Sequence, residues 1–186
     1  MGFAAALYVG LKRGRGVIKM SEKVKNFHYP DTQAFNYVKN YLENKGIEFL
    51  DIAKISQKLS SKYFPNVSLN KYLKDLLDIM HKRDVLDAYM VGISLDKLST
   101  DKQLDEPLQS ILDADAGVFS IDEILGESIA NLYGSIGSTD FGYIDHNKQG
   151  IIKRIDELKS TDNVFLDDLL GATAAALSAK TSHDNS

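Results

Sequence analysis

Two short segments of the sequence place pairs of carboxylates among apolar residues. Residues 120–129 read SIDEILGESI and residues 165–174 read FLDDLLGATA, so each has two adjacent acids, two aliphatic residues and a glycine. Brought together in space, four carboxylates would form an oxygen-lined site for a hard divalent cation such as Mg²⁺ or Mn²⁺. The four acids are Asp122, Glu123, Asp167 and Asp168.

The first pair also has a purely structural interpretation. Ser120 and Glu123 have the spacing of a capping box, in which each side chain satisfies a backbone N–H at the start of a helix. Asp122 would then lie in the first turn, where the helix dipole favours a negative charge. Capping and metal binding explain this segment equally well.

The second pair is harder to explain as surface charge. Asp162 or Asn163 is the expected cap of its helix, which would place Asp167 and Asp168 at least one turn inside. Aspartate is unfavourable there, and the surrounding residues are apolar in almost every direction. A buried carboxylate needs compensation, and a bound divalent cation would provide it.

A glycine follows the second acid of each pair after three residues. Gly126 and Gly171 therefore lie about one turn beyond Glu123 and Asp168, on the same helix faces. Glycine inside a helix costs about 1 kcal/mol relative to alanine, and close helix packing is a common reason to keep it. We expect helices 120–133 and 163–180 to cross closely, with the four acids around one or two metal ions. The alternative is small-residue packing with acids at the rim.

The segment between these helices is rich in glycine and serine, and we expect a connector there. Backbone N–H groups near Gly134, Gly137 and Gly142 would approach an anion, and Lys148 would supply a positive charge. Gly137, Thr139 and Lys148 form the predicted substrate-binding set. Asp145 is a candidate ligand, general base or nucleophile, or else a turn aspartate. His146 is expected at the surface.

Helical periodicity dominates the remainder of the chain. Asp31 and Ser68 are candidate helix caps, and Gly46 is placed to end a helix. No segment alternates at period two for long enough to predict a sheet. The sequence predicts an all-α fold, a single-domain bundle of about six to eight helices over residues 20–180. Residues 1–19 are expected to be a disordered extension, with membrane contact as the alternative, and residues 181–186 a disordered tail.

Composition excludes several classes of protein. A net charge of −4 gives no basic field that would favour nucleic acid. Since the chain has no cysteine, disulfides, thiolate nucleophiles and cysteine-based zinc sites are excluded. No stretch has the roughly 18 uninterrupted apolar residues of a membrane span.

The run from Pro107 to Ala176 resembles the phosphatidylglycerophosphatase A family, in particular its soluble branch from Gram-positive bacteria, which includes low-temperature-requirement C proteins. The matching text is EPLQSILDADAGVFSIDEILGESIANLYGSIGSTDFGYIDHNKQGII, followed by FLDDLLGATAAA. Three separate motifs occur in the family's order. The D-E motif falls on Asp122 and Glu123, the F-x-x-x-D-x-x-K motif on Phe141, Asp145 and Lys148, and the D-D motif on Asp167 and Asp168.

The resemblance implies an all-α, Mg²⁺-dependent phosphatase that converts phosphatidylglycerophosphate to phosphatidylglycerol. Two positions depart from the membrane-bound members, which have arginine where this chain has Gly142 and proline where it has Gln149. Those members also have spanning helices. The resemblance therefore implies the fold and the metal site more directly than it implies a lipid substrate, and Lys148 must bind phosphate without the arginine.

The sequence thus predicts a Mg²⁺-dependent phosphomonoesterase, with Mn²⁺ as an alternative metal. Asp122, Glu123, Asp167 and Asp168 would hold the metal, Lys148 would bind phosphoryl oxygens, and Asp145 would activate water or form an aspartyl-phosphate. The alternatives are an all-α nucleotide pyrophosphatase and a helical interaction or stress protein without activity. We expect a cytoplasmic protein, with the inner face of the membrane as a second location. The expected substrate is a phosphomonoester, with a lipid headgroup as one candidate, and homo-oligomerisation is left open.

Overall fold

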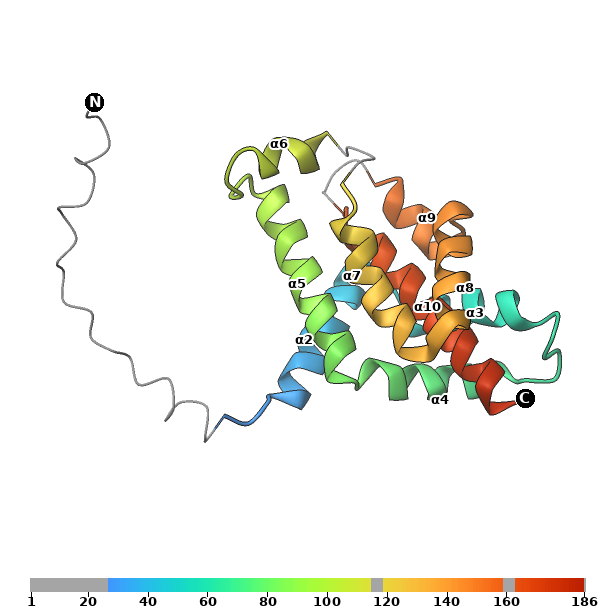
Figure 1. Cartoon of the computed structure of the whole chain (residues 1–186). Helices are drawn as coiled ribbons and strands as arrows, with labels where there is room; N and C mark the ends of the chain where they lie inside the picture. The colour runs from blue at the N-terminus through green and yellow to red at the C-terminus, as the bar shows by residue number, and fades with distance from the viewer. Residues whose placement is uncertain (1–26, 115–118, 159–162, 186) are drawn as a thin grey trace, which may run out of the picture. The chain divides into compact units, whose positions relative to one another are not determined.

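The computed structural model describes residues 27–114, 119–158 and 163–185 of the chain. These residues form α-helices and one short 3₁₀ segment, with no β-strand among them, which confirms the predicted all-α fold (Figure 1). In chain order the elements are α2 (Asp31–Asn44), α3 (Phe49–Ser60), α4 (Leu69–Met80), α5 (Arg83–Thr100), α6 (Leu108–Asp113), α7 (Ile121–Ala130), η1 (Asn131–Tyr133), α8 (Gly134–His146), α9 (Gly150–Asp156) and α10 (Leu166–Asp184).

Local signals in the sequence set several of these boundaries. Helix α2 begins at Asp31, so this residue lies in the first turn rather than at the predicted cap position. Gly46 follows its end with φ of 69°, a conformation that glycine adopts without steric cost. Ser68 caps α4, because its hydroxyl oxygen accepts a hydrogen bond from the Lys71 backbone N–H at 3.3 Å.

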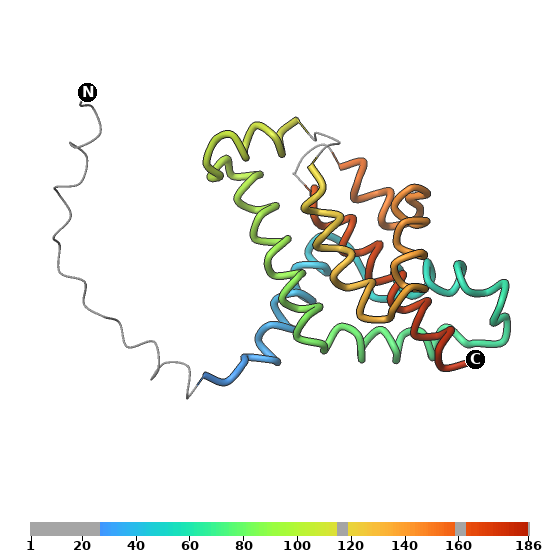
Figure 2. The backbone as a smooth tube through the Cα atoms, in the orientation of Figure 1, coloured from blue at the N-terminus to red at the C-terminus, as the bar shows by residue number. Residues whose placement is uncertain are grey.

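Helix α10 is the centre of the compact unit formed by residues 31–186. It contacts α3, α4, α5, α7, α8 and α9, and Figures 1 and 2 show it running between them. Its middle is built from fully buried small residues, including Ala172, Ala174, Ala175, Ala176 and Ala179. Small side chains let several helices approach one axis, which explains why this helix is apolar on all sides.

Residues 134–146, which the sequence analysis assigned to a connector, form helix α8 instead. Glycine and serine lower helix propensity, but propensity is a weak determinant beside tertiary packing. Phe141 and Ile144 are buried, and both lie close to Gly171 of α10. Packing against α10 thus stabilises a helix that composition alone did not predict.

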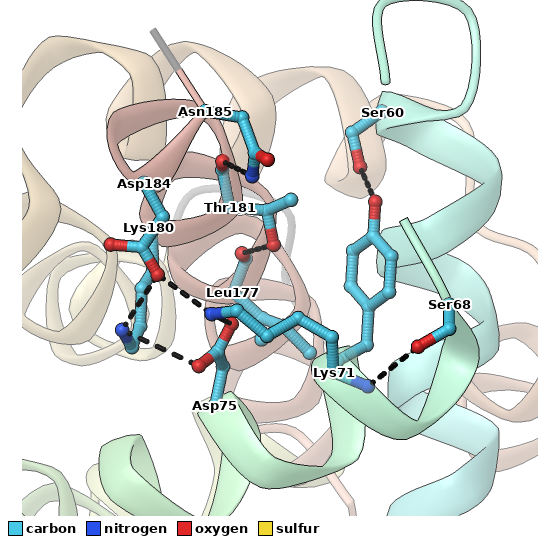
Figure 3. A network of polar contacts seen from close by, with 10 residues as sticks. Ser60, Ser68, Lys71, Asp75, Leu177, Lys180, Thr181, Asp184 and Asn185 are labelled. Carbon is cyan, nitrogen blue, oxygen red and sulfur yellow. Dashed lines mark hydrogen bonds and ion pairs between the residues drawn. The ribbon is translucent and has the colours of Figure 1, made fainter. Parts of the chain in front are cut away.

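The C-terminal segment is also more ordered than predicted. We expected residues 181–186 to be a disordered tail, but α10 continues to Asp184. The carboxylate of Asp184 pairs with Lys71 Nζ at 2.8 Å and Lys180 Nζ at 3.1 Å, and Lys71 and Lys180 also pair with the buried Asp75 (Figure 3). This network fastens the last turn of α10 to α4.

The predicted extension, residues 1–19, lies outside the described residues. Among the helices that the structure describes, none is both long enough and apolar enough to cross a bilayer.

Candidate metal and phosphate site

An acidic pocket of about 470 Å³ lies where α7 and α10 begin and where α6, α8 and α9 end. It is lined by acids from all five helices and their flanks, and Lys148 is the one basic side chain among the described residues of its wall. The acids are Asp113, Asp122, Glu123, Asp145, Asp156, Glu157, Asp167 and Asp168. The structure therefore brings together both predicted acid pairs and both predicted catalytic residues, Asp145 and Lys148.

The first turn of α10 carries Asp167 and Asp168. The helix begins at Leu166, with Phe165 as its N-cap, so the prediction of a start at Asp162 or Asn163 was wrong. Both aspartates are 5% exposed, as the apolar context predicted. The positive end of the helix dipole compensates part of their charge there, which a position deeper in the helix would not allow.

Burial makes both carboxyl groups hard to ionise in the metal-free protein. Burial, followed by the neighbouring charges of Asp167, Asp122 and Asp145, raises the pKa of Asp168 to about 8, against a smaller opposing effect of Lys148. Burial also raises the pKa of Asp167, to about 6, because a hydrogen bond from Lys148 offsets part of the effect. A nearby cation would favour ionisation of both groups.

Lys148 is the counter-charge inside the pocket. Its ammonium group lies 2.7 Å from Asp167 Oδ2, 2.8 Å from Asp156 Oδ1 and 3.8 Å from Asp145 Oδ1. Burial lowers the pKa of Lys148, but the hydrogen bonds to Asp156 and Asp167 outweigh this effect and raise it overall. Lys148 is therefore a fixed positive charge held by carboxylates from α8, α9 and α10.

The first acid pair lies at the start of α7, opposite the α10 pair. The predicted capping box is absent, because Ser120 makes no side-chain cap hydrogen bond. Instead, Asp122 Oδ1 accepts a hydrogen bond from the Glu123 backbone N–H at 3.0 Å. Since the cap interpretation fails, the position of this pair at the pocket wall becomes its main structural feature.

Gly126 provides the predicted close contact between α7 and α10, whereas Gly171 lies against α8. A Cβ atom added at Gly126 would lie 3.2 Å from the carbonyl oxygen of Asp168 and 2.7 Å from Phe141 Cζ. A Cβ atom added at Gly171 would lie 3.5 Å from Phe141 Cε2. The ring of Phe141 thus reaches the notch between α7 and α10, so α8 is the third partner of this crossing.

Gly137 and Thr139, predicted to bind substrate, do not line the pocket. Both lie within α8, and Gly137 is eight residues before Asp145, or about 12 Å along a helix axis. A Cβ atom added at Gly137 would lie 2.1 Å from the Ala130 carbonyl oxygen, so this glycine permits a backbone contact. The prediction of an anion-binding connector is therefore wrong. Lys148, which follows α8, is the group of this region that could bind a phosphate. His146 is exposed, as predicted.

The two departures from the family's motif lie outside the chemistry of the pocket wall. Gly142 is exposed, and a Cβ atom added there would have no neighbour within 4 Å. Gln149 precedes α9, and its side-chain oxygen accepts a hydrogen bond from Lys58 Nζ at 2.7 Å.

Three polar residues near the site were missed by sequence reasoning. Asp156 pairs with Lys148, and Asn163 accepts a hydrogen bond from Lys45 Nζ at 3.0 Å rather than acting as a helix cap. Asp96, one turn before the end of α5, is 1% exposed and accepts a hydrogen bond from the Phe165 backbone N–H at 3.2 Å. The contacts of Asn163 and Asp96 join distant parts of the chain, and Asp156 lies eight residues after Lys148, on the following helix, so local spacing gave no signal.

The donor chemistry of the pocket fits a hard divalent cation. In the described residues, no group of three or more acidic or histidine side chains already has metal-ligand geometry. Mg²⁺ does not require such a cage, since proteins commonly bind it through one or two carboxylates and several waters. The α7 and α10 acids offer oxygen donors on facing walls, and their excess negative charge calls for a cation.

Comparison with known proteins agrees with the fold and the motifs. The family model described as phosphatidylglycerophosphatase A matches residues 50–183. The uncharacterized protein YpjQ from Bacillus subtilis (strain 168) is 41% identical over 155 residues, which cover 83% of this chain and 88% of that protein.

Two solved structures are also similar. The crystal structure of YpjQ from Bacillus subtilis matches with a TM-score of 0.80 and 40% identity over 84% of this chain and 98% of its own. The low temperature requirement C protein from Listeria monocytogenes matches with a TM-score of 0.78 and 38% identity over 82% of this chain and 96% of its own. The resemblance to the soluble Gram-positive branch is thereby confirmed.

Proposed function

This chain belongs to the phosphatidylglycerophosphatase A family, and we propose that it is a Mg²⁺-dependent phosphomonoesterase. The observation that carries the proposal is the single pocket that the acid pairs of α7 and α10 line together with Lys148. Carboxylates that bind a metal and a lysine that binds phosphoryl oxygens are a recurring combination in phosphoryl-transfer sites.

Asp122, Glu123, Asp167 and Asp168 would hold the metal, with Mn²⁺ as a substitute for Mg²⁺. A bound Mg²⁺ supplies positive charge that neutralises the phosphate and stabilises the charge that develops during transfer. It would also compensate the buried carboxylates of α10, whose pKa values are raised by burial. The acids of the pocket would therefore ionise as the metal binds.

Lys148 would bind and orient the phosphoryl group. Its three carboxylate partners come from α8, α9 and α10, and Asp156 is the most exposed of them. If Asp167 served as a metal ligand, a phosphoryl oxygen would take its place beside Lys148, and Asp156 would still hold the ammonium group. The exchange would place a positive charge against the substrate without burying an unpaired cation.

Asp145 is the candidate acceptor of a proton from the attacking water. It lines the pocket on α8, three residues before Lys148, and its Oδ1 lies 3.8 Å from the ammonium group. A carboxylate at this position can orient a water molecule toward phosphorus and accept its proton. Direct attack by Asp145, which would form an aspartyl-phosphate, is the other route open to the same group.

A phosphorylated amphiphile such as phosphatidylglycerophosphate is the substrate class that we propose first. Ile121 and Ile124 are 51% and 61% exposed on α7, beside Asp122 and Glu123. They supply apolar surface next to an acidic, metal-binding pocket. That combination suits a phosphate headgroup attached to an apolar body better than it suits a small, fully polar phosphate ester.

Product analysis tests the proposal. The purified protein is incubated with Mg²⁺ and with phosphatidylglycerophosphate in mixed micelles, glycerol 3-phosphate or a nucleoside triphosphate, beside Asp168→Asn. We expect orthophosphate from phosphatidylglycerophosphate, abolished by EDTA and by Asp168→Asn. Pyrophosphate from the nucleotide would instead favour a nucleotide pyrophosphatase. A protein that releases neither product from any substrate, with or without metal, would contradict an enzymatic function.

A further inference from the structure

One face of α5 makes specific contacts with α10. Tyr89, Gly92 and Asp96 are spaced by three and four residues, so they lie along a single stripe of the helix. All three contact residues 165–173, the segment that contains the acidic pair of α10. Tyr89 contributes a hydroxyl group, Gly92 leaves space because it has no side chain, and Asp96 contributes a carboxyl group. Each of the three makes a different contact with α10.

Tyr89 and Gly92 fix the position of α10 along its length. The fully buried Tyr89 hydroxyl donates to the Leu169 carbonyl oxygen at 3.2 Å and lies 2.9 Å from Thr173 Oγ1. A Cβ atom added at Gly92 would lie 2.7 Å from Leu169 Cδ1 and 3.0 Å from Phe165 Cβ. Any shift of α10 along α5 would break the hydrogen bond or cause a clash.

Asp96 holds the first turn of α10. The first backbone N–H groups of a helix have no partner within it, and Phe165 supplies no side-chain cap. Asp96 Oδ1 accepts a hydrogen bond from the Phe165 N–H at 3.2 Å, and the next N–H group, of Leu166, also interacts with this carboxyl group. A residue of α5 thus caps α10 directly before Asp167 and Asp168.

The second carboxyl oxygen of Asp96 lies in an unfavourable environment. Oδ2 is buried and has no hydrogen-bond partner among the described residues. Leaving a buried polar atom unpaired costs about 1–3 kcal/mol. The hydrogen bond that Oδ1 accepts from the Phe165 N–H offsets part of this cost.

We propose that Asp96 is a positioning residue, which sets the first turn of α10 so that Asp167 and Asp168 face the acid pair of α7. It acts through the backbone of Phe165 and Leu166 and touches neither substrate nor metal. The metal-binding part of this inference rests on the proposed function. The structural part, a fixed first turn, does not.

The test compares Asp96 with Asp75, an aspartate that is 2% exposed and contacts α10 at its opposite end through Lys180. Asp96→Ala and Asp96→Leu both remove the acceptor, and Asp96→Leu also fills the space, so either suffices if the other does not fold. Asp96→Asn retains an acceptor oxygen. Asp75→Ala is the control for general loss of stability.

Two readouts are used, Mn²⁺ affinity and hydrogen exchange of the Phe165 and Leu166 amides in the metal-free protein. Replacing a group that orients a metal ligand commonly weakens metal binding about 10–100-fold. We expect that loss, with faster exchange of both amides, in Asp96→Ala and Asp96→Leu. Asp96→Asn should retain near-wild-type affinity, and Asp75→Ala should lower the melting temperature without either effect.

Unchanged Mn²⁺ affinity and unchanged amide protection in Asp96→Ala or Asp96→Leu would overturn the proposal, as would an equal loss of affinity in Asp75→Ala. If wild type binds no Mn²⁺, the proposed metal-dependent function fails, and hydrogen exchange alone decides the role of Asp96. If the Phe165 and Leu166 amides exchange faster once the acceptor at residue 96 is removed, the fixed first turn is supported. If they stay protected without that acceptor, the fixed first turn is refuted.

Discussion

At the scale of single residues, the site is governed by the burial of acids. Asp167 and Asp168 have the same exposure, yet the ammonium group of Lys148 pairs with Asp167 and not with Asp168. This difference explains why the pKa of Asp168, raised by burial and then by neighbouring acids, lies above that of Asp167.

The identity of both acids was predictable, because charged residues inside an apolar helix are conspicuous. The pairing of Asp167 with Lys148 was not predictable, since Lys148 precedes α9 and Asp167 lies on α10.

The raised pKa of Asp168 predicts an inverse effect of pH on metal-free stability. Burial raises this pKa from an ordinary 3.8 to about 8, so the folded state binds a proton that the unfolded state has released. The contribution of the Asp168 carboxyl group to the free energy of unfolding is therefore fully present below about pH 4 and is lost as pH rises through about 8. In EDTA, the melting temperatures of wild type and Asp168→Asn should be similar near pH 4, and the variant should be the more stable near pH 8. A wild type that gains stability over the variant with rising pH would contradict this prediction.

Lys148 is predicted to contribute to catalysis rather than to folding. Lys148→Met removes the positive charge that would bind phosphoryl oxygens, and we expect orthophosphate release to fall about 10²–10³-fold, as on loss of a comparable electrostatic donor. Lys153→Met is the control. Lys153 lies on α9 and forms an exposed ion pair with Glu157, so this variant should retain activity. Equal rates for the two variants, measured with Mg²⁺ at saturating substrate, would remove Lys148 from the mechanism.

At the scale of elements, the site depends on the crossing of α7, α8 and α10. The repeated glycine predicted that α7 and α10 approach closely, and Gly126 does lie against the backbone of Asp168. The participation of α8 was missed because its glycines and serines are typical of a loop. What overrides this composition is tertiary contact, since Phe141 and Ile144 are buried and lie close to Gly171 of α10.

Gly126→Ala should separate α7 from α10. The added Cβ atom would lie 2.7 Å from Phe141 Cζ and 3.2 Å from the Asp168 carbonyl oxygen. Overpacking of this kind costs about 1–3 kcal/mol, and displacement of either acid pair should also weaken Mn²⁺ binding. Gly142→Ala is the matched control in α8, where the added atom has no neighbour within 4 Å. Chemical denaturation should show the control to be about 0.5–1 kcal/mol more stable than wild type. A similar gain for Gly126→Ala would refute the close crossing.

At the scale of the whole molecule, α10 is both the central helix and the carrier of two site acids. Helical periodicity and the absence of alternation were sufficient to predict an all-α protein. The ends of α10 were not predictable, because they are set by distant partners. Asp96 on α5 caps its first turn, and Lys71 on α4 pairs with Asp184 in its last (Figure 3). Stability and site geometry are therefore properties of the same helix.

Overpacking the middle of α10 should destabilise the entire molecule. Ala174 is fully buried, and its carbonyl oxygen accepts a hydrogen bond from the Ser56 hydroxyl of α3. Ala174→Leu should lower the free energy of unfolding by about 1–3 kcal/mol or more, because several helices must move to admit the side chain. Ala114→Leu, at the exposed end of α6, should stay within about 0.5 kcal/mol of wild type. Urea denaturation of both variants gives the comparison, and equal midpoints would contradict a tightly packed centre.

Mn²⁺ titration followed by electron paramagnetic resonance shows whether acids from α7 and α10 bind one divalent cation together. We expect saturable binding by wild type. We also expect a loss of affinity of at least about tenfold in both Asp122→Asn and Asp168→Asn. Asp113→Asn, a pocket acid that pairs with Lys102, should bind Mn²⁺ nearly as well as wild type. Undiminished Mn²⁺ binding when Asp122 and Asp168 are both replaced by asparagine, or no binding by wild type, would refute a metal site shared by α7 and α10.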